Sequence, residues 1–393
     1  MINKSSFGTL IFAIAAGILI SGCGSAAPTV TETTVAATEA APSSPEIIDT
    51  IRPAGMTAGE KEEGAGSGGS PDAGSEGSSG TDAPLVGIVA GTGGIDDGSF
   101  NQGAWEGLQR LSGKTGCETR FYETKSEEDF QKNVHDLIDR GGDLCWATGY
   151  SSADLLLQEA LEHPDTSFAI IDYSYPDTPA NMTGVVFRSQ ESSFLAGFVA
   201  GNVTASGKVG FVGGESNEVI DQFRYGYRAG VLYAADKLGK TIDVEEVFAG
   251  SFTDPGKGKS LALELYKKGC DVVFHASGET GMGVIEAAKE TGKYVIGVDK
   301  DQSFLAPDNV LTCVLKDVNT AVFRVSGEIL DGSEPGGRTV SLGLAENAEG
   351  LSENHSLYPE EVYEEMLQLR EDIISGKITP PGSEAEFGEY SGG

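Results

Sequence analysis

Residues 272–299 read VVFHASGETGMGVIEAAKETGKYVIGVD, and this stretch indicates the fold. A short apolar run, Val272 to His275, precedes a glycine-containing loop and a segment of helical period, Met282 to Glu290. A second run rich in β-branched residues follows, from Val295 to Asp299. Two apolar runs joined through one helix are typical of a β–α–β unit with parallel strands. We therefore predict a parallel sheet covered by helices.

The same alternation extends over most of the chain from residue 85 onward. The strands predicted for a first sheet are Val86 to Ala90, Thr119 to Glu123, Leu144 to Thr148, Phe168 to Asp172 and Gly184 to Phe187. Those predicted for a second sheet are Val209 to Gly213, Val244 to Phe248, Val272 to His275, Val295 to Asp299 and Val310 to Leu315. The helices predicted between them include Gln102 to Ser112, Asp129 to Arg140, Ala153 to Glu162, Gly226 to Lys237, Lys257 to Lys268 and Met282 to Glu290. This order predicts an α/β fold of two lobes, each a doubly wound, mainly parallel sheet.

Length and pattern together predict how the chain is divided. The part after residue 84 is long enough to form two separate cores. We assign residues 85–205 to an N-terminal lobe, completed by a segment from about 318 to 380, and residues 206–317 to a C-terminal lobe. An amphipathic helix is expected from Glu360 to Ser375 and is predicted to pack on the first lobe. Residues 381–393, acidic and rich in glycine, are expected to form a flexible tail.

The N-terminus predicts export. Residues 1–22 combine a lysine with an apolar run, Leu10 to Ile20, which is typical of a signal peptide and too short for a membrane span of about 20 residues. The sequence ISGC at 20–23 resembles the bacterial lipobox, which implies a diacylglycerol on Cys23; an ordinary secretory cleavage site is the alternative. Residues 23–84 cannot bury enough apolar surface to fold, and they predict a disordered tether. We expect a lipid-anchored protein on the extracytoplasmic face of the cell membrane.

Composition excludes several kinds of partner and site. A net charge of -33 argues against binding to nucleic acid or to anionic lipid headgroups. Apart from Cys23, the cysteines are Cys117, Cys145, Cys270 and Cys313, without CxxC spacing or neighbouring histidines, so we expect no metal site and no cofactor. Two disulfides are one alternative for these cysteines, and four buried free thiols are the favoured one.

The loops after the strands carry the candidate binding residues, because ligands of open parallel sheets lie beyond the carboxyl ends of the strands. These loops contain Asp97, Phe100, Asn101, Asp172, Phe252, Gly278, Asp299 and Lys316. Ser99 or Asn101 is placed to cap the next helix. Phe100 and Phe252, one from each lobe, could hold a flat ring between them. Asp172 and Asp299 could accept hydrogen bonds from paired hydroxyls, with Lys316 balancing their charge. For each of these residues a structural role, such as a helix cap or a lid over the core, is the alternative.

Several stretches at these loops together resemble one known family. They are GIDDGSFNQ at 94–102, FTDP at 252–255, GVDKDQ at 297–302, and the segments 191–197, 223–230 and 278–283. They are similar to the basic membrane protein family of lipoproteins, the substrate-binding components typified by purine nucleoside receptors of ABC transporters. The resemblance covers nearly all of residues 85–380 and implies a type I periplasmic-binding-protein fold. It implies capture of a nucleoside, with a purine nucleoside expected, for delivery to an ABC permease and its ATPase.

The resemblance also implies roles for individual residues. Phe100 and Phe252 would stack on the base, Asn101 and Asp172 would add polar contacts, and Gly278, Asp299 and Lys316 would hold the ribose. This chain departs from the family pattern at Gly91, where nucleoside-binding relatives often carry an aspartate that accepts a base N–H. Asp96 or Asp97, a water molecule, or a different ligand would account for the departure.

Other functional classes remain as alternatives. A cleft with carboxylates, a lysine and His275 could hydrolyse a glycosidic bond. However, no nucleophile elbow is present, GKS at 258–260 lacks the P-loop glycine because Thr253 stands in its place, and the histidines are scattered along the chain. We therefore predict a binding protein and not an enzyme, and we expect a monomer. A sugar or other small polar ligand, or a signalling receptor in place of the permease, stays open.

Overall fold

The computed structural model describes residues 83–91 and 94–392, all within one compact unit, Gly77–Gly393. The predicted signal peptide, Cys23 and all but the last two residues of the predicted tether lie outside the described residues. Within the described ranges, no helix has the length and apolar character needed to cross a bilayer.

Two sheets form the centres of two lobes, as predicted, but each has six strands where five were predicted, because the edge strands β11 and β12 were missed. The first sheet has the order β11-β5-β4-β3-β1-β2 and is parallel throughout. Its strands are β1 (Leu85–Ala90), β2 (Glu118–Tyr122), β3 (Leu144–Thr148), β4 (Ser167–Ile171), β5 (Met182–Phe187) and β11 (Arg338–Leu342). The second sheet has the order β12-β10-β9-β8-β6-β7, and its edge strand β12 runs antiparallel to β10. Its strands are β6 (Lys208–Gly213), β7 (Asp243–Phe248), β8 (Val272–Ala276), β9 (Tyr294–Asp299), β10 (Val310–Lys316) and β12 (Glu349–Leu351).

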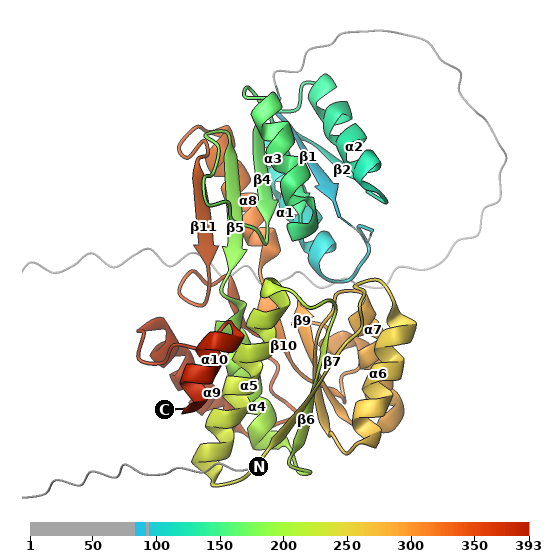
Figure 1. Ribbon diagram of the computed structural model, residues 1–393, viewed down its shortest axis with the longest axis vertical. Helices are drawn as coiled ribbons and strands as arrows, with labels where there is room; N and C mark the ends of the chain where they lie inside the picture. Colours follow the sequence, from blue (N-terminus) through green and yellow to red (C-terminus); the bar gives the residue numbers. More distant parts are fainter. Residues whose placement is uncertain (1–82, 92–93, 393) are drawn as a thin grey trace, which may run out of the picture. The chain divides into compact units, whose positions relative to one another are not determined.

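Helices connect the strands and cover both sheets (Figure 1). The first lobe contains α1 (Phe100–Thr115), α2 (Glu127–Asp139), η1 (Tyr150–Ser152), α3 (Ala153–Glu162) and α8 (Val318–Leu330). The second lobe contains α4 (Ser189–Val203), α5 (Glu218–Leu238), α6 (Pro255–Lys267), α7 (Thr280–Thr291), η2 (Ser303–Leu305), α9 (Glu360–Ile374) and α10 (Glu384–Gly392).

Period-two alternation along the central strands produces separate cores on the two faces of each sheet. In β1, Ile88 joins the core formed with α1 and α8, whereas its neighbour Val89 joins the core formed with α2 and α3. In β6, Phe211 packs with α4, α5 and α9, whereas Val212 packs with α6 and α7. Both faces of each sheet are therefore buried, which explains why these strands read as continuous apolar runs.

Three chain crossings define the lobes, and they correct two of the predicted boundaries. The crossings follow β5, β10 and β11. The predicted boundary at residue 205 is wrong, because Phe194 and Phe198 of α4 belong to the core of the second lobe. The segment 318–342 completes the first lobe as predicted, but the chain then returns to the second lobe, where α9 packs on α4 and not on the first lobe.

The C-terminal end is also more ordered than predicted. The predicted flexible tail, residues 381–393, contains the helix α10. Phe387 and Tyr390 of this helix pack against the core of the second lobe. The guanidinium carbon of Arg228 lies 4.2 Å from the centre of the Phe387 ring. Two aromatic anchors in an otherwise acidic, glycine-rich segment thus hold the tail on the protein.

The four described cysteines are free and buried, in agreement with the favoured alternative. Burial raises the pKa of the Cys270 thiol to about 11 and that of Cys313 to about 12. These thiols therefore stay protonated at neutral pH and behave as small apolar side chains.

Candidate ligand-binding site

A cavity of about 280 Å³ is lined by residues of both lobes. This volume lies just below the range for small-molecule sites, about 300 to 1,000 Å³. All the residues predicted from the strand-end loops line it, namely Asp97, Phe100, Asn101, Asp172, Phe252, Gly278, Asp299 and Lys316. They follow or end β1, β4, β7, β8, β9 and β10, so the carboxyl ends of the two sheets converge on one site.

A buried ion pair joins the lobes at this cavity. Lys316 Nζ lies 2.7 and 2.6 Å from the two carboxylate oxygens of Asp172, and both side chains are less than a tenth exposed. The same Nζ lies 5.0 Å from the ring centres of both Phe100 and Phe187, within the range of cation–π attraction. Asp172 adopts a left-handed backbone (φ 67°), which directs the chain out of β4 at this point. Lys316 thus has two kinds of partner on the first lobe.

Asp299 makes a second contact between the lobes. It ends β9 with a left-handed backbone (φ 65°) and accepts a hydrogen bond from the Ser99 hydroxyl of the first lobe. Burial raises the pKa of Asp299 to about 6, and the nearby charge of Lys316 opposes part of that rise. A carboxylate held here is a strong acceptor for a ligand hydroxyl.

Ser99 occupies the N-cap position of helix α1, as one of the two predicted alternatives, but its side chain makes no capping hydrogen bond, and the Asp97 carboxylate supplies these bonds instead. The Asp97 carboxylate accepts hydrogen bonds from the backbone N–H groups of Ser99 (2.9 Å), Asn101 (2.8 Å) and Gln102 (3.1 Å). Burial raises the pKa of Asp97, and these N–H bonds oppose the rise. Because a carboxylate offers about four lone-pair sites, most of its accepting capacity is already used. Asp97 is therefore a weak substitute for the aspartate that the family resemblance led us to expect at position 91.

The surroundings of Gly91 are polar but crowded. Its N–H donates to Thr148 Oγ1 at 3.1 Å, and that hydroxyl donates to Asn101 Oδ1 at 2.8 Å. A Cβ at position 91 would lie 3.1 Å from the Thr148 carbonyl oxygen and 3.7 Å from Ser151 Oγ. Both Thr148 and Ser151 line the cavity, so hydroxyl groups stand beside the position of the missing carboxylate.

Glycines shape the wall around Phe252. A Cβ at Gly214 would lie 2.2 Å from the Phe252 ring, and a Cβ at Gly278 would lie 3.3 Å from the Phe252 carbonyl oxygen. Gly278 also has a positive φ of 55°, which a side chain would strain. The glycine-containing loop after β8 therefore allows Phe252 to pack at the cavity wall.

Sequence reasoning missed several lining residues. Tyr150 of the first lobe donates from its hydroxyl to Glu215 (2.9 Å) and accepts from Asn217 (3.1 Å), both of the second lobe. Burial and the bond to Glu215 raise the pKa of Tyr150 to about 12. No pattern in the sequence links these residues, because they meet only across the lobes. Phe223 could have been found, since it is an aromatic residue within the family-like segment 223–230.

Ser277 is a further missed residue with a direct bearing on ligand chemistry. It lines the cavity, it is fully buried, and its Oγ has no hydrogen-bond partner among the described residues. An unpaired buried hydroxyl costs about 1–3 kcal/mol. A polar ligand group or a water molecule in the cavity would remove this cost.

His275 does not lie at the site. It is fully buried in β8 and does not line the cavity, because its ring packs at the start of α7, where a Cβ at Gly281 would come within 2.1 Å of it. Burial lowers the pKa of His275 to about 4, so the imidazole is neutral at neutral pH. The residue that suggested a hydrolase is thus part of the core of the second lobe.

Glu349 is a buried carboxyl group close to the site. It lies in β12, is 4% exposed, and accepts hydrogen bonds from the hydroxyls of Ser189 and Ser192 in α4. Burial raises its pKa to about 8, despite these two bonds and the charge of Lys316. A raised pKa in the folded state stabilises the fold fully below the unfolded value of about 4.3, and this contribution is lost as the pH rises through 8.

We expect Glu349→Gln to flatten the dependence of stability on pH. Between pH 5 and pH 8, the parent chain should lose on the order of a few kcal/mol of unfolding free energy relative to the variant, because only the parent must ionise a buried carboxyl. Urea denaturation at both pH values measures this difference. The exposed Glu353→Gln is the control. Parallel curves for the parent and Glu349→Gln would contradict the prediction.

Comparison with known proteins identifies the family. The family described as ABC transporter substrate-binding protein PnrA-like matches residues 85–384. Basic membrane protein A of Borreliella burgdorferi is 37% identical over 320 residues, which cover 80% of this chain and 93% of that protein. Basic membrane protein B of Borrelia garinii is 38% identical over 306 residues, covering 71% and 84% of the two chains.

Solved structures agree with this assignment. A solute-binding protein of an ABC transporter system from Aeropyrum pernix K1 superposes with a TM-score of 0.70 at 26% identity, covering 78% of this chain and 96% of that one. A solute-binding protein from Conexibacter woesei superposes with a TM-score of 0.63 at 25% identity, covering 76% and 99%. These proteins bind substrates and are not enzymes, and those of this family act outside the cytoplasm. The chain therefore belongs to the PnrA-like, or Bmp, family of ABC transporter substrate-binding proteins.

Proposed function

We propose that this chain is a lipid-anchored receptor that captures a nucleoside, of the purine type, between its lobes. The observation that carries this proposal is the cavity between Phe100 on the first lobe and Phe252 on the second. Two aromatic side chains from different lobes at one cavity suit a flat ring better than a pyranose, because ring stacking adds about 0.5–1.5 kcal/mol for each pair.

The remaining wall suits a sugar with neighbouring hydroxyls. Asp172 and Asp299 are strong acceptors, and Lys316 supplies a cation that compensates them. The unpaired hydroxyl of Ser277 adds a group that can donate or accept. Asn101 and the backbone of Gly278 complete the predicted contacts. A base joined to a ribose presents both kinds of surface that this cavity offers.

The polar edge of the base would be recognised by other groups than in relatives with a carboxylate at position 91. Asp97 is engaged with the N-terminus of α1. Ser151 and Thr148 stand nearest to the place where the missing side chain would be. We therefore expect hydroxyls, or a water molecule held by them, to contact the polar edge of the base.

Anchoring and delivery follow from the N-terminus and the family. The sequence ISGC at 20–23 predicts a diacylglycerol on Cys23, and residues 24–84 would connect this anchor to the folded receptor. The receptor would act as a monomer and present its closed lobes to an ABC permease driven by an ATPase. Release of the ligand would require the lobes to open.

Mass spectrometry of the chain purified from native membranes tests both parts of the proposal. We expect the mass of a diacylglyceryl group on Cys23 and a nucleoside released on denaturation. An unmodified Cys23 would exclude anchoring and leave ligand capture intact. A sugar in place of the nucleoside would exclude the ligand and leave anchoring intact.

Phe252→Ala is expected to weaken nucleoside affinity about tenfold or more, since loss of stacking and burial is worth at least about 1.4 kcal/mol. Isothermal titration calorimetry with purine nucleosides measures the change. Phe304→Ala is the matched control, because Phe304 is 75% exposed and lies outside the cavity. Equal affinities for the two variants would remove Phe252 from the site.

A further inference from the structure

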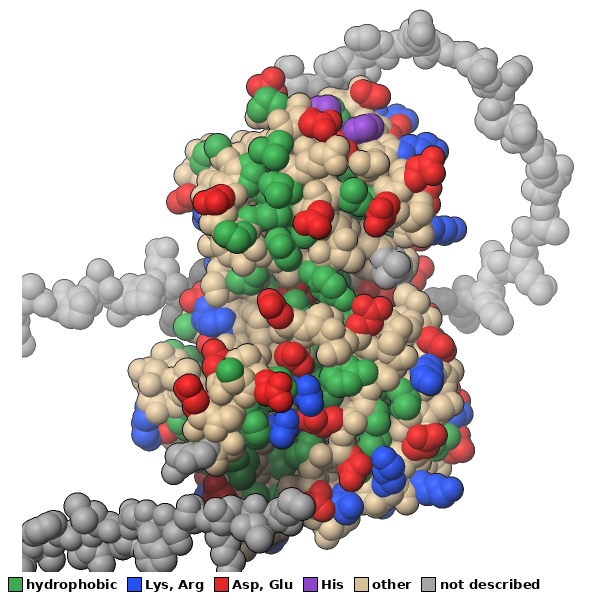
Figure 2. All heavy atoms as spheres, in the orientation of Figure 1, with side chains coloured by type: hydrophobic (Ala, Val, Ile, Leu, Met, Phe, Trp, Pro, Cys, Tyr) green, Lys and Arg blue, Asp and Glu red, His purple; other side chains and the backbone are tan. Residues whose placement is uncertain are grey.

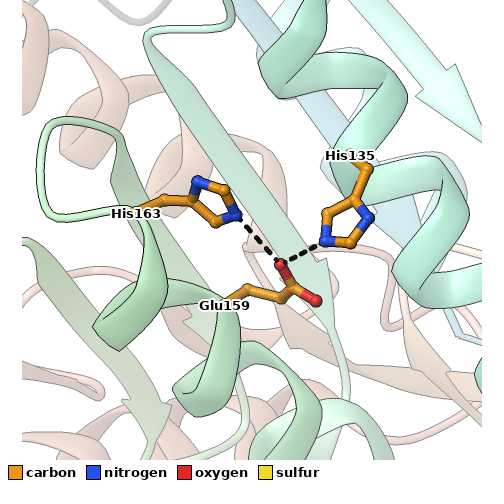
Figure 3. A group of neighbouring side chains, drawn as sticks. All are labelled: His135, Glu159 and His163. Atoms are coloured by element: carbon orange, nitrogen blue, oxygen red, sulfur yellow. Dashed lines mark hydrogen bonds and ion pairs between the residues drawn. The ribbon is translucent and has the colours of Figure 1, made fainter.

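Two histidines and a glutamate, distant from the cavity, come together on the first lobe. His135 lies on α2, and Glu159 and His163 lie on α3 and at its C-terminal end. Figure 3 shows both imidazole rings directing a nitrogen toward the same carboxylate oxygen of Glu159. The distances from this oxygen are 2.9 Å to His135 Nε2 and 3.6 Å to His163 Nε2. The sequence had suggested scattered histidines, but the packing of α2 on α3 brings these two together.

The positions of the three ligand atoms suit a transition-metal ion. All three lie within 4.8 Å of one another. Around a tetrahedral zinc ion with bonds of about 2.0–2.2 Å, ligand atoms are about 3.4 Å apart. Small side-chain rotations would therefore bring all three to bonding distance. Glu159 and His163 are one helical turn apart, so α3 itself presents two of the ligands on one face.

The burial of Glu159 provides an independent reason to expect a cation. Its side chain is 1% exposed, and among the described residues its ion-pair partners are the two imidazoles alone. A neutral imidazole donates a hydrogen bond but no charge, whereas a buried carboxylate needs compensation of its charge. A divalent ion would compensate the carboxylate fully. It would also bind two neutral imidazoles, the form that coordinates metals.

The site is accessible from solvent. The side chains of His135 and His163 are 52% and 33% exposed. In Figure 2, histidine side chains gather on the surface of the first lobe at the end that points away from the second lobe. An ion could enter there, and a water molecule or another ligand could fill the fourth position.

We propose that His135, Glu159 and His163 bind one divalent transition-metal ion, with zinc the best match. Two nitrogen ligands and one oxygen ligand with an open position form a recurrent zinc set. The ion would connect α2 to α3 on the outer face of the first lobe. None of its ligands lines the ligand cavity, so it would stabilise this lobe without taking part in capture.

Zinc titration of the full-length, untagged and EDTA-treated chain tests the proposal. We expect one Zn²⁺ per chain by equilibrium dialysis with elemental analysis, and a melting temperature raised by several degrees at saturation. Co²⁺ in place of Zn²⁺ should give the visible bands of a site with nitrogen and oxygen ligands, without thiolate charge-transfer bands. Such a spectrum separates this site from any binding by cysteines. A wild-type chain that binds no Zn²⁺ would overturn the proposal.

Matched variants locate the ion. His135→Gln and His163→Gln should each weaken Zn²⁺ binding at least about tenfold, and the double variant should abolish it. His355→Gln is the control, because His355 pairs with Glu360 at 2.9 Å on the second lobe but has no second imidazole beside it. Unchanged binding in the double variant, or equal loss in His355→Gln, would place the ion elsewhere. Circular dichroism without metal verifies that the variants fold. If they do not fold, the Co²⁺ spectrum of the wild-type chain still shows whether the ion has nitrogen and oxygen ligands.

Discussion

Lys316→Met is expected to lower the free energy of unfolding by about 3–5 kcal/mol, because it leaves the Asp172 carboxylate buried without its cation. Urea denaturation measures this loss. Opening of the lobes would hydrate Asp172, so part of the cost should appear as open chains with a larger radius of gyration in small-angle X-ray scattering. The ligand would also lose the charge that balances the two carboxylates at the cavity.

Lys300→Met is the matched control for this prediction. Lys300 also joins the lobes, through Glu106 at 2.7 Å, but the two side chains are 32% and 40% exposed. Such a pair contributes about 0–1 kcal/mol. Adding Asp172→Asn to Lys316→Met should restore most of the lost stability, because position 172 then carries no charge that needs the lysine. A double variant as unstable as the sum of the two single variants would contradict this explanation.

Gly230→Ala is expected to destabilise the second lobe by about 3 kcal/mol, because it forces α4 and α5 apart. A Cβ at Gly230 would lie 1.9 Å from the carbonyl oxygen of Phe194, and a Cβ at Gly197 would lie 2.1 Å from that of Tyr227. The contact is thus reciprocal and involves backbone atoms, which side-chain rotation cannot relieve. Thermal and urea unfolding both measure the loss.

Gly327→Ala provides the control for the effect of glycine itself. Gly327 lies inside α8, and nothing lies within 4 Å of a Cβ at this position. There the substitution should stabilise the chain by about 0.5–1 kcal/mol, because alanine favours the helix. If Gly230→Ala and Gly327→Ala change the stability in the same direction, the explanation is wrong: position 230 would not need glycine for the close approach of α4 and α5.

The cavity could be predicted because parallel strands end at a common edge. Each predicted site residue follows or ends a strand that the apolar runs had located, and all of them line one cavity. The roles of the neighbouring residues were less predictable. Ser99 follows a strand and precedes a helix, as a cap does, yet its hydroxyl bonds Asp299 of the other lobe. Whether the Ser99 hydroxyl bonds the N-terminus of α1 or Asp299 depends on how closely the two lobes approach each other.

Local periodicity predicted ten of the twelve described strands, most of the helices and the loops that line the cavity, because it reports which faces of an element are buried; it missed the edge strands β11 and β12. The division between the lobes could be seen only in the tertiary structure. Helix α4 is buried from Ser192 to Gly201, and its partner α5, which places it in the second lobe, lies further along the chain. The tertiary structure also decided the Lys316–Asp172 pair and the grouping of His135, Glu159 and His163. These contacts join residues that are far apart in the sequence or lie on separate helices. A local sequence pattern carries no information on how close two such elements come, because their packing decides it.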